Sequence, residues 1–233
     1  FETLKASTTG ANNTAVGFRS LKANTTGTNN AALGNVSLFT NTTGSYNAAV
    51  GYGSLSSTVN GSYNTAVGEF SLYSNLNTGN AAVGSSCLVL NRNGIYNAGF
   101  GFFSLYNNVF GSLNTAFGAY SLYNNVSGSN NTALGYYAGA YATSSSEFYV
   151  NNQDRTNLAG DKSGSLFYGT FNATPANQTL RINANTTIAG DLTATSFTGS
   201  LLGTASYATT ASYATHGGTI SFGPIIAYNN RMF

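Results

Sequence analysis

A five-residue phrase, repeated at an almost constant spacing, constrains this chain more than any other feature. The phrase begins with Asn and ends at Gly17, Gly34, Gly51, Gly68, Gly84, Gly101, Gly118 and Gly135. Successive closing glycines are 17 residues apart, except for one step of 16 residues between Gly68 and Gly84. Self-similarity at a fixed period is typical of chains built from one structural unit stacked along an axis.

The length of the unit decides which kind of stack is possible. Helical repeats need about 34 residues and propeller blades about 40, so a unit of half that length excludes both. Each unit holds an apolar run, Thr14–Val16 in the first, and a Ser-Leu pair, Ser20-Leu21. We expect both pieces to be extended, with Gly and Asn at corners of positive φ. The chain is therefore predicted to be all-β, a parallel β-solenoid or β-roll of about eight coils stacked about 4.8 Å apart.

Equivalent positions of the repeat form columns with distinct chemistry. One column admits only alanine or glycine, which predicts a crowded position where chain meets chain or the coil bends. Its members are Ala15, Ala32, Ala49, Ala66, Ala82, Gly99, Ala116 and Ala133. The following column, which begins with Val16, points to the opposite face and is expected to fill the core together with the Leu21 column. Asn13 and its equivalents are expected to stack as side-chain amide ladders.

The repeat ends near residue 141, and two segments with different sequence patterns follow. Short alternating runs at 148–150, 166–168 and 180–182 predict a small β module over residues 142–190. Residues 191–233 are interpreted as a fibrous connector and a terminal strand at 219–226. Within them the hexad Thr204–Thr209 is duplicated as Thr210–Thr215, which leaves a stacked β-fibre and a helix both open.

Composition excludes several classes of function. Only 6% of the residues are charged, and the net charge of +2 is spread along the chain, so nucleic-acid binding is not expected. No apolar stretch approaches the length of a transmembrane helix, so membrane insertion is not expected either. With 42% hydrophobic and 13% aromatic residues the chain has enough apolar surface to fold.

Two resemblances suggest where such a chain works. The phrase N-(T/A)-A-(V/L/F)-G-x-x-S resembles the head repeats of trimeric autotransporter adhesins, which implies a parallel β-roll wound as a homotrimer. The segment Thr179–Thr215 is similar to bacteriophage tail-fibre proteins, which often carry such arrays. Together they imply an extracellular, fibrous, self-associating chain, with a trimer expected. The leading hypothesis is a rod-forming, receptor-contacting segment of a tail fibre or similar virion appendage, and the alternative is a bacterial surface adhesin or extracellular filament subunit.

Residues suited to catalysis are scarce. His216 lies between glycine-rich neighbours, and Cys87 takes a position that serine fills in other repeats. Glycan hydrolysis requires a pair of carboxylates. The candidates for such a pair are Glu147, Asp154 and Asp161. We expect no enzymatic activity, no cofactor and no metal site.

One column suggests a binding surface. Phe39, Tyr73, Tyr106 and Tyr123 each follow a ladder leucine, and an aromatic stripe there would suit the sugar rings of a host-surface glycan. Packing along the rod or between chains is the competing interpretation. Asn-x-Ser/Thr triplets occur at Asn12, Asn24, Asn41 and Asn172, although a chain so rich in Asn and Thr produces them by composition.

Overall fold

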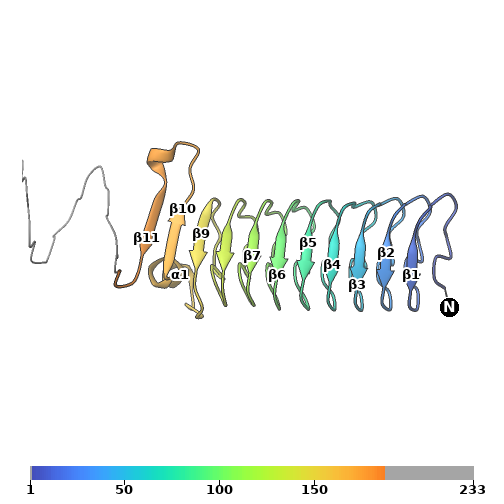
Figure 1. Cartoon of the computed structure of the whole chain (residues 1–233), viewed down its shortest axis with the longest axis horizontal. Coiled ribbons are helices and arrows are strands. Elements are labelled where there is room, and N and C mark those ends of the chain that lie inside the picture. Colours follow the sequence, from blue (N-terminus) through green and yellow to red (C-terminus); the bar gives the residue numbers. More distant parts are fainter. Residues whose placement is uncertain (1, 187–233) are drawn as a thin grey trace, which may run out of the picture. The chain divides into compact units, whose positions relative to one another are not determined.

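The computed structural model of this chain describes residues 2–186, in which stacked coils share one continuous sheet (Figure 1). Each coil contributes one three-residue strand, and neighbouring strands run parallel with equivalent residues paired, as Ala15 with Ala32. The eight strands are β1 (Thr14–Val16), β2 (Ala31–Leu33), β3 (Ala48–Val50), β4 (Thr65–Val67), β5 (Ala81–Val83), β6 (Ala98–Phe100), β7 (Thr115–Phe117) and β8 (Thr132–Leu134). The predicted parallel β-solenoid is confirmed.

The sheet continues past residue 141 into a cap. Strand β9 (Glu147–Val150) pairs parallel to β8, and β10 (Phe167–Thr170) and β11 (Thr179–Ile182) follow as an antiparallel hairpin. Between β9 and β10 lies helix α1 (Leu158–Gly164), which the sequence did not predict, and a 3₁₀ turn over Pro175–Asn177 precedes β11. Within residues 2–186 no helix is long and apolar enough to cross a bilayer. The connector predicted at residues 191–233 lies outside the described residues.

The alanine column faces the inside of the coil. This corrects two expectations: that the alanine column meets another chain, and that the Val16 column fills the core. Ala49 and Ala66 are fully buried, and they pack with the buried leucines of the Leu21 column. The Val16 column points outward, with exposed fractions of 55% at Val16 and 57% at Phe117. The predicted alternation holds, but the sides are reversed because the coil is too thin to take a large side chain from both walls.

The Ser20-Leu21 segment is a turn and not the extended piece that was predicted. Leu21 and its equivalents have left-handed backbone, with φ between 47° and 53°. Such backbone costs a residue with a Cβ roughly 1–2 kcal/mol, whereas full burial of a leucine side chain contributes about 1.5–3 kcal/mol. The Leu21 amide also donates to the Ser37 carbonyl of the next coil at 3.0 Å. Burial and inter-coil bonding therefore hold a conformation that leucine by itself avoids.

The two glycine columns have different physical causes. Gly17 and its equivalents have positive φ, 127° at Gly17, as predicted for corners. The second column, which consists of Gly10, Gly27, Gly44, Gly61, Gly94, Gly111 and Gly128, does not have positive φ. A Cβ on Gly27 would lie 2.3 Å from the Gly44 carbonyl oxygen of the next coil, so close stacking requires glycine. Gly79 does not belong to this second column, as its φ of 76° places it at the corner that Tyr63 and Tyr96 occupy in adjacent coils. The one-residue deletion between Gly68 and Gly84 is thus absorbed before Gly79.

Amide ladders run through the interior, as predicted for the Asn13 column. Asn47 donates from Nδ2 to Asn30 Oδ1 at 3.1 Å, and its backbone N–H donates to the same oxygen at 3.0 Å. A second ladder was missed by the sequence analysis, and it consists of Asn24, Asn41, Asn75, Asn91, Asn108 and Asn125. Thr58 interrupts it and leaves Asn41 Oδ1 without a partner among the described residues.

Burial separates the glycosylation triplets named above. Asn24 and Asn41 are fully buried in the second ladder, so the folded chain offers no access to them. Asn12 and Asn172 are exposed.

The single glycine in the alanine column, Gly99, is explained by Cys87. A Cβ on Gly99 would lie 2.6 Å from the Cys87 sulfur, whereas the equivalent pair Ser104 and Ala116 coexists in the next coil. We predict that Gly99→Ala lowers the free energy of unfolding by about 1–3 kcal/mol through overpacking. In a Cys87→Ser background the same change should cost little. Urea unfolding of the double-mutant cycle measures this, and additive effects would contradict the pairing.

Candidate functional site

The four predicted stripe residues occupy equivalent positions, but they do not form one stripe. Ser56 and Val89 separate them, so only Tyr106 and Tyr123 are adjacent, with ring centroids 5.4 Å apart and planes 13° apart. Phe39 lies instead beneath the Lys22 ammonium, 5.9 Å from the ring centroid. Tyr73 makes an edge contact with Phe70 at 5.5 Å. The column therefore supplies one tyrosine pair and two separate aromatic positions.

A second aromatic column, missed in the sequence, enlarges that pair into a cluster. Phe103, Tyr120 and Tyr137 stack on one another, with centroids 5.5 Å apart for Phe103–Tyr120 and 4.7 Å for Tyr120–Tyr137. We call the whole cluster the aromatic lattice, and its members are Phe102, Phe103, Tyr106, Tyr120, Tyr123, Tyr136 and Tyr137. The signal was present, since aromatic residues precede Ser-Leu or Ala-Gly at 102–103, 120 and 136–137.

The lattice presents apolar ring surface together with neutral phenol groups. Its rings are half-buried or exposed, and partial burial raises the pKa of Tyr123 and of Tyr137. Neutral hydroxyls both donate and accept hydrogen bonds, and aromatic faces pack against other flat apolar surfaces. A surface of this kind suits the C–H face of a sugar ring or another aromatic side chain.

Charge gathers at the two ends of the described chain. Near the start, Glu2 pairs with Lys5 at 3.0 Å, Arg19 at 3.1 Å and Lys22 at 2.5 Å. Hydrogen bonds from Lys22 and Lys5 lower the pKa of Glu2 to about 2. Between residues 23 and 146 the only charged side chains are Glu69 and Arg92. The coils therefore present a long surface that is nearly free of charge.

The carboxylates considered for catalysis are engaged within the cap. Glu147 is buried and accepts from Tyr149 Oη at 2.7 Å and Tyr168 Oη at 3.0 Å, while Lys162 lies 2.6 Å from it. Asp154 is exposed and accepts from Tyr141 Oη at 3.1 Å. In these contacts Glu147 ties β9, β10 and α1 together. His216 lies outside the described residues.

Asp161 and Cys87 are both buried and protonate more readily than usual. Asp161 Oδ2 accepts the Tyr141 backbone N–H at 2.7 Å, whereas Oδ1 has no partner among the described residues. Burial raises the pKa of Asp161 to about 6 and that of Cys87 to about 12. Cys87 is thus a thiol at neutral pH and a poor nucleophile. Among residues 2–186 no cluster of His, Cys, Asp or Glu is placed to hold a metal ion.

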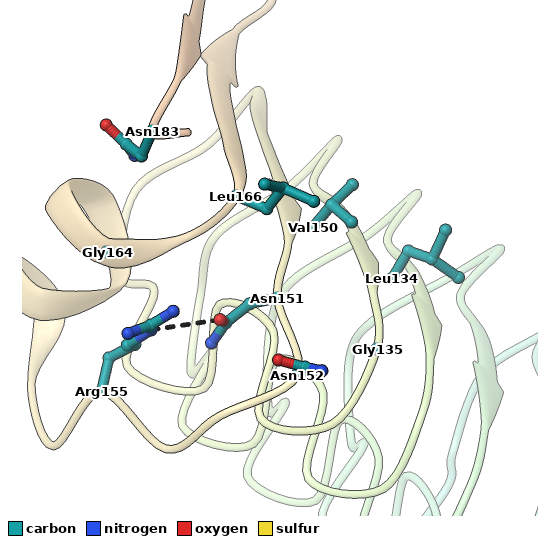
Figure 2. Close-up of a pocket in the computed structure, with 9 residues that line it drawn as sticks. All are labelled: Leu134, Gly135, Val150, Asn151, Asn152, Arg155, Gly164, Leu166 and Asn183. Carbon is teal, nitrogen blue, oxygen red and sulfur yellow. Dashed lines mark hydrogen bonds between the residues drawn. The ribbon is translucent and has the colours of Figure 1, made fainter. Parts of the chain in front are cut away.

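A cavity of about 420 Å³ lies where the last coil meets the cap (Figure 2). Leu134, Val150 and Leu166 form its apolar wall, and Asn151, Asn152 and Arg155 come from the loop after β9. Arg155 Nε donates to Asn151 Oδ1 at 3.1 Å, the contact drawn in Figure 2. The cavity is not apparent from the sequence, because its walls come from separate parts of the chain.

The raised pKa of Asp161 predicts a pH-dependent cap. Because the folded chain binds this proton more tightly than the unfolded chain, with a pKa of about 6 against 3.8, stability from this group is present at low pH. We expect it to be lost as pH rises from about 4 to about 6, by up to roughly 3 kcal/mol for two pKa units. Asp161→Asn should remove most of this slope in urea unfolding, and the exposed Asp154→Asn should not. An unchanged slope in Asp161→Asn would contradict the assignment.

Comparisons with protein-family models, with curated proteins and with solved structures give no match to this chain. Its function is therefore inferred from its own geometry. Three features carry that inference: the outward apolar column of the sheet, the aromatic lattice and the cavity at the cap.

Proposed function

We propose that this chain is a rod-forming structural segment of a phage tail fibre or comparable virion appendage, which acts outside the cell as an assembly of identical chains. The observation that carries the proposal is an apolar column on the outer face of the sheet, here called the outward stripe. It consists of Val16, Leu33, Val50, Val67, Val83, Phe100, Phe117 and Leu134. Apart from half-buried Phe100, these side chains have exposed fractions between 36% and 57%.

The position of the outward stripe favours a covered surface. Parallel sheets are almost always covered on both faces, yet here the outer face of β1–β8 has no cover within the described chain. The other outward positions of these strands hold only Ala or Thr, such as Thr14 and Ala31. Removal of this surface from water contributes about 25 cal/mol per Å². A partner would therefore gain free energy from contact along the whole stripe.

The regularity of the stripe favours a second copy of this chain as the partner. Its side chains recur once per coil, at the strand spacing of about 4.8 Å, and a partner with the same spacing matches it at every coil. The near absence of charge between residues 23 and 146 leaves little repulsion between identical chains. We propose that three chains assemble, because the repeat resembles the heads of trimeric adhesins.

The aromatic lattice supports a receptor-contacting role for the same rod. It exposes ring surface from three successive coils, including Phe102, Tyr120 and Tyr136. Glycans on a host surface are the ligand class that such rings suit. No catalytic step is proposed, because Glu147 and Asp161 are buried and each is hydrogen-bonded within the chain.

The first test concerns assembly. We predict that Val50→Lys with Val67→Lys converts a dilution-resistant oligomer into monomers, because two ammonium groups per chain would be buried at the contact. Analytical ultracentrifugation measures the change, with circular dichroism to check folding. The matched control is Thr26→Lys with Asn93→Lys, at exposed positions outside the stripe. A folded wild-type monomer, or an oligomer that both double variants retain, would refute the proposal.

The second test concerns glycan contact. Tyr120→Ala with Tyr123→Ala should weaken binding to immobilised neutral polysaccharides of host cell surfaces at least tenfold, since stacked ring surface is lost. Biolayer interferometry measures binding, and sedimentation shows whether assembly persists. Tyr63→Ala, which removes a ring stacked on Tyr46 at 5.0 Å outside the lattice, serves as control. If binding persists while the oligomer dissociates, the lattice packs between chains and does not contact the receptor.

A further inference from the structure

The cavity at the cap contains a cation that is held in place and makes no ion pair, although its charge acts on the Asp161 carboxyl from a longer distance. Arg155 is half-buried, and among residues 2–186 no carboxylate lies within ion-pair distance of it. Its one side-chain hydrogen bond in this part of the chain runs from Nε to Asn151. The terminal guanidinium nitrogens, the pair that binds a carboxylate in parallel, therefore keep their donors.

The surrounding backbone fixes the guanidinium position. A Cβ on Gly164 would lie 3.1 Å from both Cδ and Nε of Arg155, so this side chain packs directly on the glycine at the end of α1. Asn151, which receives the Nε hydrogen bond, is itself buried and donates to the Gln153 carbonyl. Contacts on two sides thus restrict the side chain before any ligand arrives, which reduces the entropy lost on binding.

The rest of the cavity combines amide and apolar surface. The Asn152 side chain is exposed and makes no hydrogen bond within the described residues, so it can both donate and accept. Figure 2 shows Leu134, Val150 and Leu166 in a row beside these polar groups. Leu134 and Leu166 are 50% and 44% exposed. A volume of about 420 Å³ is within the range of small-molecule sites.

We propose that this cavity binds a sugar unit that carries a carboxylate, such as a uronic or sialic acid residue of a surface polysaccharide. The carboxylate pairs with Arg155, ring hydroxyls bond to the Asn152 amide, and the C–H face of the ring lies on Val150 and Leu166. A single guanidinium matches a monoanion, whereas a phosphate monoester dianion would stay half neutralised. Of the other two cations of the cap, Lys162 is already paired with Glu147, and Arg181 does not line this cavity.

The site extends the proposed receptor contact but rests on different residues. Every group that it uses belongs to one chain, and none belongs to the aromatic lattice. Loss of neutral-glycan binding in the Tyr120 and Tyr123 variant would therefore leave it intact. Only Leu134 is shared with the outward stripe, and binding is to be measured on the assembled full-length chain.

The experiment is isothermal titration with the methyl glycosides of glucuronic, galacturonic and sialic acid. At least one acid should bind, while methyl β-glucoside and acetate each bind at least tenfold more weakly, because each lacks half of the contacts. Arg155→Gln should weaken acid binding at least tenfold, and Arg155→Lys should weaken it less, since it keeps the charge but not the paired donors. Arg92→Gln, an exposed arginine in a middle coil, is the matched control and should bind as wild type.

Three results would overturn the inference. The first is the absence of binding by all three acids, and the second is undiminished binding by folded Arg155→Gln. The third is acetate binding as tight as that of the acid sugars, which would reduce the cavity to a site for an adventitious anion. Thermal unfolding of each variant shows whether a loss of binding comes from the site or from the fold.

Discussion

Hydrogen bonding between successive coils at a fixed register is the constraint on which the rest of this structure depends. Backbone donors such as the Leu21 amide bond to a carbonyl of the next coil, here that of Ser37, and residues of the same repeat position pair between neighbouring strands. At this spacing each side chain is stacked on its own equivalent. A position therefore tolerates only residues that can lie against a copy of themselves, which explains the repetition of the sequence.

The buried asparagines show how polar groups meet that condition. An amide carries both donor and acceptor, so it can bond to the coil on one side while it accepts from the other. Thr58 takes the place of an asparagine in the coil next to Asn41 and does not donate to its side chain. Asn41 Oδ1 therefore lacks a partner within the described chain. Such a position shows that the stack accepts a local defect when backbone bonds on both sides persist. The interior is thus held by polar ladders as much as by its thin apolar filling.

The surfaces proposed for ligand contact lie where the repeat is least regular. The coils offer an outward stripe suited to self-association, whereas the aromatic lattice lies between Phe102 and Tyr137 and the cap adds charge, a helix and a cavity. The cap also ends the stack by turning the sheet antiparallel after β9. A rod that repeats one surface for assembly and places distinct chemistry at one end is consistent with a fibre segment that contacts a receptor.

The sequence alone determined the period, the parallel pairing, the site of the one-residue deletion and the first asparagine ladder, because each follows from identity between equivalent positions. It could not determine which column faces inward, since alternation along a strand separates two faces without saying which is buried. Tertiary structure decided that alanine lies opposite leucine inside the coil, and that leucine adopts left-handed backbone there. Contacts such as Cys87 with Gly99, and the cavity around Arg155, join residues that share no repeat position. They arise from how the coil closes and how the cap folds back, and local pattern encodes neither.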